Sequence, residues 1–139
     1  MIIVAALPFA AHWIRGGADE RCAWDGLEID PVYRVRIVEQ PGITYTFCCV
    51  QCAVRWLDRR EVAPRDIFVT DEASGAEIPA REASYVRSTV STNAITGNRV
   101  HAFRTAEDAM KHAQAAGGRR LIGAERPFAG ITFSDSDVP

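Results

Sequence analysis

The stretch Tyr45-Thr46-Phe47-Cys48-Cys49-Val50-Gln51-Cys52 joins an expected strand, residues 43–47, directly to an expected helix that begins near Cys49. A second stretch, Cys22-Ala23-Trp24-Asp25-Gly26, holds the remaining cysteine, so all 4 cysteines lie in these two places. A thiol at a helix N-terminus lies at the positive end of the helix dipole, which favours the thiolate. Thiolate is the form that binds a soft metal ion or attacks an electrophile. The two stretches therefore predict a soft-metal site, with the rest of the chain as its scaffold.

The spacing of the later cysteines leaves the choice of ligand pair open. Cys48 and Cys52 are four residues apart and Cys49 and Cys52 are three apart, so either pair can share one helix face. Inert buried thiols are common, but three of them within five residues at a helix start are not. Four cysteines are too few and too close together for a disulfide framework. A metal or reactive-thiol site is favoured over inert thiols or a bridge from Cys22 to the later cluster, and a redox disulfide is its competitor.

Composition limits the classes of partner. The chain has 139 residues, enough for one ordinary domain or two very small halves, and 47% of them are hydrophobic. The net charge is −2, and all basic residues but Lys111 are arginines scattered along the chain. Such a chain has neither the basic field that nucleic acid requires nor a polybasic patch for anionic lipid. We expect no nucleic-acid partner.

The N-terminal residues form an apolar run, Ile2 to Ile14, that only Pro8 and His12 interrupt. The run is shorter than the roughly 20 residues of a membrane span, and it lacks the basic start and cleavage site of a signal peptide. It is either part of a membrane anchor that starts further upstream or a helix packed on the domain. Because the run has no polar face, we expect residues 1–15 to be an anchor and residues 16–21 a polar linker.

The sequence pattern of residues 22–124 predicts an α+β domain. Its elements come in the order strand, strand, helix, strand, and this order occurs twice. The repeats form two small ββαβ-type halves, at about residues 22–71 and 84–124, after the N-terminal hydrophobic helix. Each hairpin has one face to cover, and a single helix can cover it. Residues 125–139 are expected to form a loosely held tail. The expected strands are 32–38, 43–47, 66–70, 85–90, 99–103 and 119–122, with helices from about 49 to 60 and from Thr105, as N-cap, to Gly117.

Cys22-x-x-Asp25-Gly26 followed by Phe47-Cys48-Cys49-x-x-Cys52 resembles the short metal-binding knuckle of YHS- and TRASH-type domains. That knuckle has Cys-x-x-Cys-Gly and then Phe-Cys-Ser-x-x-Cys. Here Asp25 stands in place of the second Cys, and Cys49 stands in place of Ser. The departure at Asp25 argues against a four-thiolate structural zinc site, and zinc is kept only as an alternative to copper.

A resemblance over about Cys22 to Leu121 points to the accessory proteins of nitrous oxide reductase, the NosL family, whose fold is shared with organomercurial lyase. The resemblance implies an exported, membrane-tethered bacterial protein on the extracytoplasmic side, periplasmic or cell-surface, that binds Cu(I). It also implies a metalloenzyme or a copper-trafficking protein as partner. The matching segments are the Cys-x-x-Asp-Gly loop, Phe47-Cys48-Cys49, Val69-Thr70-Asp71 with Ser74-Gly75, Ser84-Tyr85-Val86, and Ala102-Phe103 before an Ala-rich helix closed by Gly117-Gly118.

The chain departs from that family in having no Met beside the site, and Met110, on a helix stripe, is expected in the core. Copper would then be held by cysteine thiolates, which select Cu(I). Asp25 is a weaker ligand or a residue that fixes the loop. His101 is a further candidate ligand, although its place between Val100 and Ala102 on a strand makes a solvent-facing side chain the default. The candidate metal ligands are thus Cys22, Asp25, Cys48, Cys49, Cys52 and His101.

An enzyme is the second hypothesis. Cys22 and Asp25 resemble the first Cys and the catalytic Asp of organomercurial lyase, and Cys49 lies in the region that resembles its later Cys. Two thiolates could hold mercury while the carboxyl transfers a proton to the leaving carbon. We rank this second because two short halves leave little room for a lid over a substrate.

Overall fold

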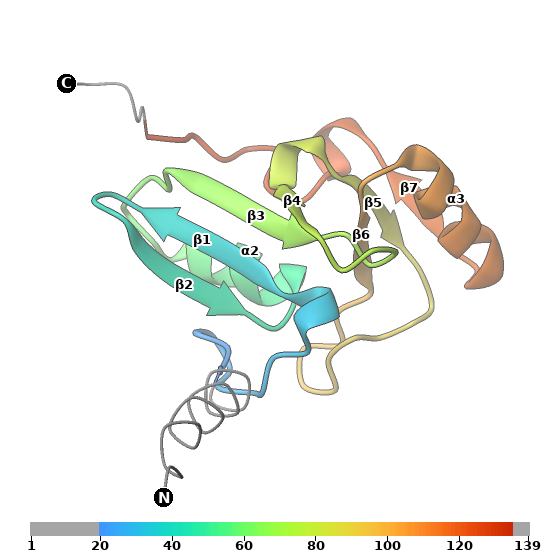
Figure 1. Cartoon of the computed structure of the whole chain (residues 1–139), viewed down its shortest axis with the longest axis horizontal. Helices are drawn as coiled ribbons and strands as arrows, with labels where there is room; N and C mark the ends of the chain where they lie inside the picture. The colour runs from blue at the N-terminus through green and yellow to red at the C-terminus, as the bar shows by residue number, and fades with distance from the viewer. Residues whose placement is uncertain (1–19, 135–139) are drawn as a thin grey trace, which may run out of the picture.

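The computed structural model describes residues 20–134, and these form two antiparallel sheets (Figure 1). The first sheet has the order β2-β1-β3-β4 and the second the order β6-β5-β7. Helix α2 follows β2, and helix α3 follows β6, so the fold is α+β as predicted. The bounds are β1 Val35–Glu39, β2 Ile43–Phe47, α2 Val50–Asp58, β3 Asp66–Thr70, β4 Glu77–Pro79, β5 Ser84–Arg87, β6 Val100–Phe103, α3 Ala106–Ala115 and β7 Arg119–Leu121, with short 3-10 turns η1 Pro31–Tyr33, η2 Ala80–Glu82 and η3 Gly123–Glu125.

The predicted repeat is confirmed by the topology. In each half the first strand is central, the second strand pairs with one of its edges, and the strand after the helix pairs with the other, giving β2-β1-β3 and β6-β5-β7. The first sheet has one strand more. β4 pairs with β3 at the edge, in a segment that was not among the expected strands.

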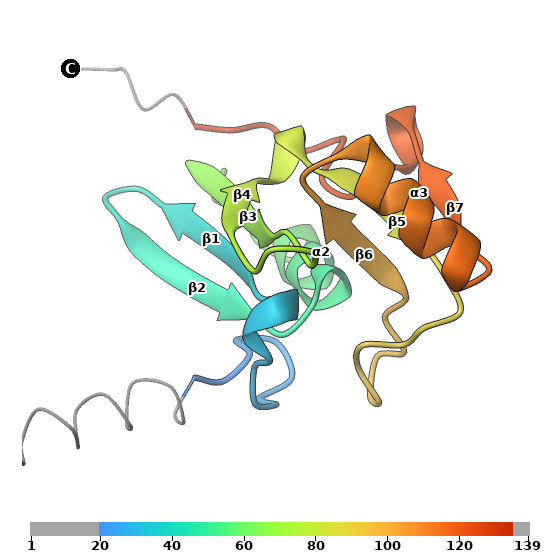
Figure 2. The ribbon, with the colours of Figure 1, turned by 45° about the vertical axis from the view of Figure 1, so that its right-hand side comes forward.

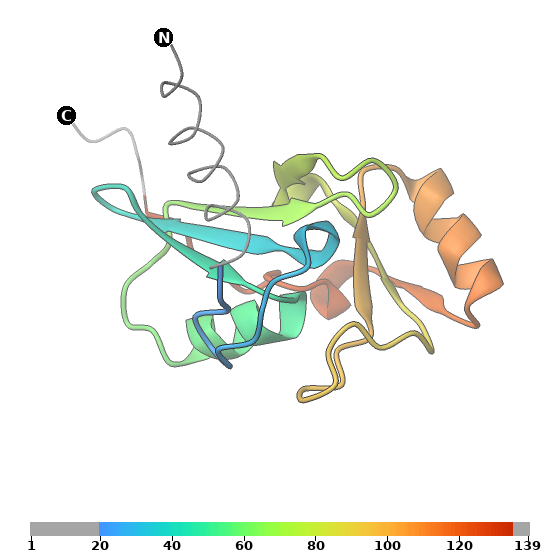
Figure 3. The same cartoon turned by 60° about the horizontal axis from the view of Figure 1, so that its bottom comes forward.

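Helix α2 lies between the two sheets. It packs on β1 and β2 of the first sheet and also contacts β6 of the second, whereas α3 packs on β5, β6 and β7. Figure 2 shows β6 between the two helices, and Figure 3 shows α2 on one face of the first sheet with α3 at the far end. Because α2 is enclosed from both sides, residues at its first turn lie in the main core. The residues of α2 that this packing buries are Val50, Cys52, Ala53 and Leu57.

The two strand-to-helix junctions are built alike. In the first half β2 ends at Phe47, and Cys49 is the N-cap of α2, accepting a hydrogen bond from the backbone N–H of Cys52 at 3.5 Å. In the second half β6 ends at Phe103, and the N-cap of α3 is the predicted Thr105. A side-chain acceptor at this position satisfies a backbone N–H that the helix itself cannot. Cys49 therefore has the structural role of a Thr in the other half.

Three expectations need correction or fall outside the described residues. The strand expected over 85–90 ends at Arg87. The tail is not loosely held at its start, because Phe128 and Ile131 pack against the core and the Ser134 N–H donates to the carbonyl of Pro64 at 2.8 Å. The expected anchor, residues 1–15, and most of the linker lie outside the described residues. Within residues 20–134 no helix is long and apolar enough to span a membrane.

Candidate metal centre

The loop after Cys22 is a closed turn attached to the end of β2. The Cys22 N–H donates to the carbonyl of Leu27 at 2.8 Å, and Asp25 Oδ1 accepts from the Leu27 N–H at 3.0 Å. The Ala23 N–H donates to the carbonyl of Thr46 at 2.9 Å. These bonds fix the loop beside the junction between β2 and α2, where the other cysteines lie. Asp25 thus fixes the loop, as one of the two expected roles required, and the loop holds Cys22 beside the later thiols.

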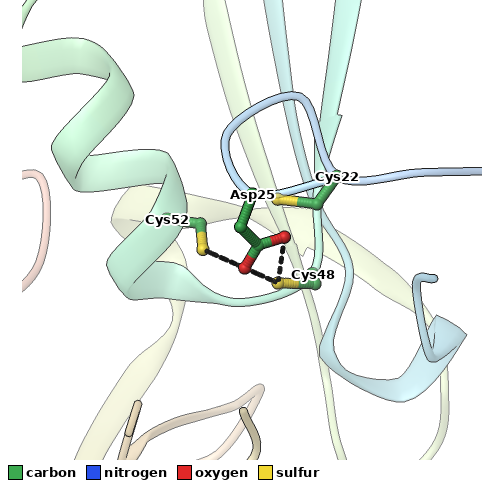
Figure 4. A group of neighbouring side chains, drawn as sticks. All are labelled: Cys22, Asp25, Cys48 and Cys52. Carbon is green, nitrogen blue, oxygen red and sulfur yellow. Dashed lines mark hydrogen bonds between the residues drawn. The ribbon is translucent and has the colours of Figure 1, made fainter. Parts of the chain in front are cut away.

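Four of the predicted site residues converge on one point. One ligand atom from each of Cys22, Asp25, Cys48 and Cys52 lies within 4.8 Å of the other three. The Sγ atoms of Cys48 and Cys52 are 3.6 Å apart. Asp25 Oδ2 is 3.2 Å from Cys52 Sγ and 3.4 Å from Cys48 Sγ. Figure 4 shows the carboxylate between the two sulfurs, with Cys22 on the loop beside it. All three cysteines are buried free thiols.

Cys49 is placed differently from the other three cysteines. Its side chain is buried and caps α2, and its Sγ lies 3.8 Å from Thr96 Oγ1. It is not part of the group of four that converges within 4.8 Å. Of the two pairings that the sequence left open, the structure brings Cys48 and Cys52 together at the site. Cys49 instead stabilises the helix start that positions them.

His101 is buried and lies apart from the thiols. Its side chain is 1% exposed, so the expected solvent-facing position is wrong. Nδ1 bonds to Glu72 Oε1 at 2.9 Å, and Nε2 bonds to the carbonyl of Val90 at 3.0 Å. The ring also packs on His112 of α3, which covers this face of β6. Met110, expected in the core, is 42% exposed on α3.

Asn93 is a site residue that the sequence did not indicate. It lies on the loop between β5 and β6 and is buried. Its amide Nδ2 donates to Asp25 Oδ2 at 3.0 Å and to Cys48 Sγ at 3.0 Å. The site is therefore completed by the second half of the molecule, since Cys22, Asp25, Cys48 and Cys52 all come from the first.

The thiols of the cluster share protons unequally. Hydrogen bonds from Cys48 and then Cys52 lower the pKa of the Cys22 thiol well below its usual value, despite burial. The counterpart is that the pKa of Cys52 is raised, first by its hydrogen bond to Cys22 and then by those to Cys48 and Cys49. The pKa of Cys48 is raised for the same first reason. The pKa of the Cys49 thiol is lowered to about 3, first by hydrogen bonding to Cys48 and then to Cys52. Negative charge is thus favoured on Cys22 and Cys49, while Cys48 and Cys52 keep their protons, and each of these protons is donated either to a neighbouring sulfur or to Asp25.

No protein-family model matches the chain, and no curated protein matches it in sequence. Among solved structures, the fold is similar to the crystal structure of the copper chaperone NosL from Shewanella denitrificans, with a TM-score of 0.64. The match covers 74% of this chain and 86% of that chain at 18% sequence identity. The chain has a NosL-like fold. The resemblance inferred from the sequence is thereby confirmed for the fold.

Within this NosL-like fold, the donor set of the site suits a metal ion. Three sulfurs and one carboxylate oxygen within 4.8 Å match both the thiolate ligation that soft Cu(I) prefers and a four-coordinate zinc site. The start of α2 adds the positive end of a helix dipole, which stabilises negative charge on Cys48 and Cys52. The cluster can therefore hold a metal ion with ligands that the fold has already brought together.

Proposed function

We propose that this protein binds Cu(I) through the thiolates of Cys22, Cys48 and Cys52 and passes the ion to another copper protein. The observation that carries the proposal is the convergence of these sulfurs, with Asp25, within 4.8 Å in a buried site. Soft thiolates select Cu(I) over harder ions. The similarity in fold to the copper chaperone NosL supports the same function, and zinc is the alternative ion.

Loading the site requires the thiols to lose their protons, because the thiolate is the ligand. Asp25 Oδ2 accepts from the thiols of both Cys48 and Cys52, so it is the nearest base for those protons. A carboxylate is a hard ligand and adds little beside thiolates for Cu(I). In this proposal Asp25 acts mainly on protons and on the loop, and the three sulfurs hold the ion.

The proposal includes a location. The apolar run at residues 2–14 would tether the protein to a membrane on its extracytoplasmic side, where a metalloenzyme or a copper-trafficking protein would receive the ion. The composition of the run and the resemblance to the NosL family support this part. It rests on the sequence, because the run lies outside the described residues.

A competition titration against a chromogenic Cu(I) chelator, with reduced protein under anaerobic conditions, tests the proposal. Wild-type protein is expected to withdraw Cu(I) from the chelator, and a Cys48→Ser, Cys52→Ser double variant is expected to lose this ability. Cys49→Ser is the matched control, because it changes a neighbouring thiol that caps α2 and lies outside the group of four. Equal competition by the wild type and the double variant would show that this is not a copper site.

An enzyme of the organomercurial lyase type remains the second candidate, because Asp25 lies between two thiols. Those thiols are Cys48 and Cys52, whereas the sequence pointed to Cys49. The assay is release of hydrocarbon from a simple organomercurial in excess thiol, with Asp25→Asn as the variant that cannot transfer the proton. We expect no turnover by the wild type. Turnover by the wild type that disappears in Asp25→Asn would refute the carrier hypothesis and support the enzyme hypothesis.

A further inference from the structure

Both ends of the Asn93 side chain are engaged, one by the thiol site and one by its own loop. The Nδ2 amide donates to Asp25 Oδ2 and to Cys48 Sγ, each at 3.0 Å, and lies 3.9 Å from Cys49 Sγ and from Cys52 Sγ. The Oδ1 atom accepts from the backbone N–H groups of Ile95 at 2.7 Å and Thr96 at 2.9 Å. Because backbone N–H groups only donate, the orientation of the amide is fixed with Nδ2 toward the site.

The donors around Asp25 change when a metal ion enters. In the reduced protein Asp25 Oδ2 accepts from the thiols of Cys48 and Cys52 and from Asn93. Metal ligation removes the thiol protons, and two of these three donors are then lost while negative charge on sulfur increases. The amide of Asn93 cannot lose a proton at ordinary pH. It remains as the donor that offsets the negative charge of the Asp25 carboxylate and the Cys48 thiolate.

We propose that Asn93 is the positioning residue of the metal centre, holding Cys48 and Asp25 in place for the ion through its amide and coupling them to loop 93–97 through its carbonyl. This inference rests on the proposed metal-binding function. Hydrogen-bonding partners of metal ligands orient the ligand and tune its basicity, and their removal costs about tenfold or more in metal affinity. Asn93 acts on the ion through Cys48 and Asp25.

The link between the site and loop 93–97 ends at a residue on the molecular surface. Ile95, whose N–H is held by Asn93 Oδ1, is 66% exposed, while Asn93 itself is 5% exposed. Thr96, the other residue held by Oδ1, approaches Cys49 Sγ through its own hydroxyl. The hydrogen bonds of Asn93 therefore connect Ile95, at the molecular surface, to the Cys48 thiol. A change at the site that displaces the amide must also release the turn at 93–96.

Two variants separate the two ends of the side chain. Asn93→Asp is nearly isosteric and keeps an oxygen to accept from Ile95 and Thr96, but it replaces the N–H donor with a negative charge facing Asp25. Asn93→Ala removes both ends. The matched control is Asn98→Ala, because Asn98 is equally buried and closes the base of the same loop. Its Nδ2 donates to Thr92 Oγ1 at 2.7 Å and to the carbonyl of Val100 at 3.1 Å, neither of which is at the site.

The test combines Cu(I) competition with the spectrum of Co(II) as a probe ion, on the full chain, after circular dichroism has shown each variant to be folded. We expect Asn93→Asp and Asn93→Ala to weaken Cu(I) binding about tenfold or more and Asn98→Ala to change it less than about twofold. Loss of an N–H···S hydrogen bond raises the energy of sulfur electrons. The sulfur-to-cobalt charge-transfer band should therefore move to longer wavelength in both Asn93 variants and stay in place in Asn98→Ala.

The outcomes distinguish this inference from the proposed function. Wild-type affinity and spectrum in Asn93→Asp would overturn the inference while Cu(I) binding stands. An equal loss in Asn98→Ala would also overturn it, because loop rigidity alone would then explain the effect. If the wild type binds Co(II) but not Cu(I) and the band still shifts in the Asn93 variants, the positioning role holds and the copper function fails. A wild type that binds neither ion overturns both.

Discussion

Replacing Glu72 by Gln should destabilise the protein much more at pH 5 than at pH 9. The reason lies in the two partners of His101, which are both acceptors: the Glu72 carboxylate on Nδ1 and the Val90 carbonyl on Nε2. Only the doubly protonated ring can donate to both. Burial alone favours the neutral ring, but the hydrogen bond and charge of Glu72 outweigh it, so the pKa of His101 is above its usual 6.5. The other ionisable side chains that face the ring are Tyr33 of η1 and His112 of α3.

The sign of the pH dependence follows from that pKa. A group whose folded-state pKa is raised contributes stability that is fully present below its unfolded pKa, near 6.5, and is lost as pH rises through the folded value. The pKa of His112 is lowered, first by burial and then by the charge of His101, so it acts in the opposite direction. In Glu72→Gln a charged His101 has no counter-ion, and acid pH becomes the destabilising condition.

The size of the effect comes from the burial of the pair. The side chains of His101 and Glu72 are 1% and 12% exposed, and removing one partner of a buried ion pair typically costs about 3 kcal/mol or more. Above the folded-state pKa of His101 the wild-type ring is neutral, and the variant then loses only hydrogen bonding, at about 1 kcal/mol. For a chain of this length a loss of about 3 kcal/mol lowers the melting temperature by about 10 °C.

Thermal unfolding of wild type and Glu72→Gln at pH 5 and pH 9 measures the difference. The control is Glu77→Gln, which breaks the more exposed pair with Arg36 and should cost less than about 1 kcal/mol at either pH. A difference between wild type and Glu72→Gln that is the same at both pH values would refute the reasoning, because the charge of His101 in the folded protein would then not change between them.

Two further predictions concern packing and location. Gly118→Ala should destabilise the fold by about 1 to 3 kcal/mol in denaturant unfolding, because the added Cβ would lie 2.6 Å from the carbonyl oxygen of Arg87. The control is Gly130→Ala, which should be nearly neutral because its added Cβ meets nothing within 4 Å. The native protein should fractionate with membranes and resist a high-salt wash, whereas a chain starting at Gly16 should be soluble and folded; unfolding on that truncation would instead favour a helix packed on the domain.

The features that the sequence predicted correctly depend on local patterns. The alternation of polar and apolar residues predicted the first hairpin, although the strand expected over 32–38 begins later, because residues 31–33 form η1 and β1 starts at Val35. The run from Phe47 into Cys49 combines a strand end with a helix start, and the structure has both there. Cys22 could be assigned to the same site as the later cysteines because the chain has only 4 cysteines and all of them can bind a soft metal ion. The short strand β4 was not predicted because it ends in Pro79. Proline argues against a strand except at the edge of a sheet, where β4 lies.

The features that the sequence missed depend on contacts between distant segments. Asn93 is 45 residues from Cys48, and an Asn in a loop more often serves the turn alone, which Oδ1 of Asn93 also does. Strand alternation correctly turns His101 away from Val100 and Ala102, but it does not tell which face of a strand is covered. That depends on where α3 and η1 come to lie, and they cover the His101 face.

The matching strand-to-helix junctions of the two halves show which features serve the fold and which serve the thiol site. Phe47, Cys48, Cys49 and Cys52 occupy the places that Phe103, Arg104, Thr105 and Asp108 occupy in the other half, where a hydroxyl and not a thiol caps the helix. The second half is thus an internal reference that shows the same backbone built without sulfur. The backbone of the junction therefore does not require thiols, although the two places differ in burial, because Cys48 and Cys52 are buried whereas Arg104 is exposed and Asp108 is half-buried. For protein engineering, Cys48 and Cys52 are positions at which the ligand type can be exchanged to alter the ion preference of the site while the two sheets are kept, provided that the new side chains fit a buried space.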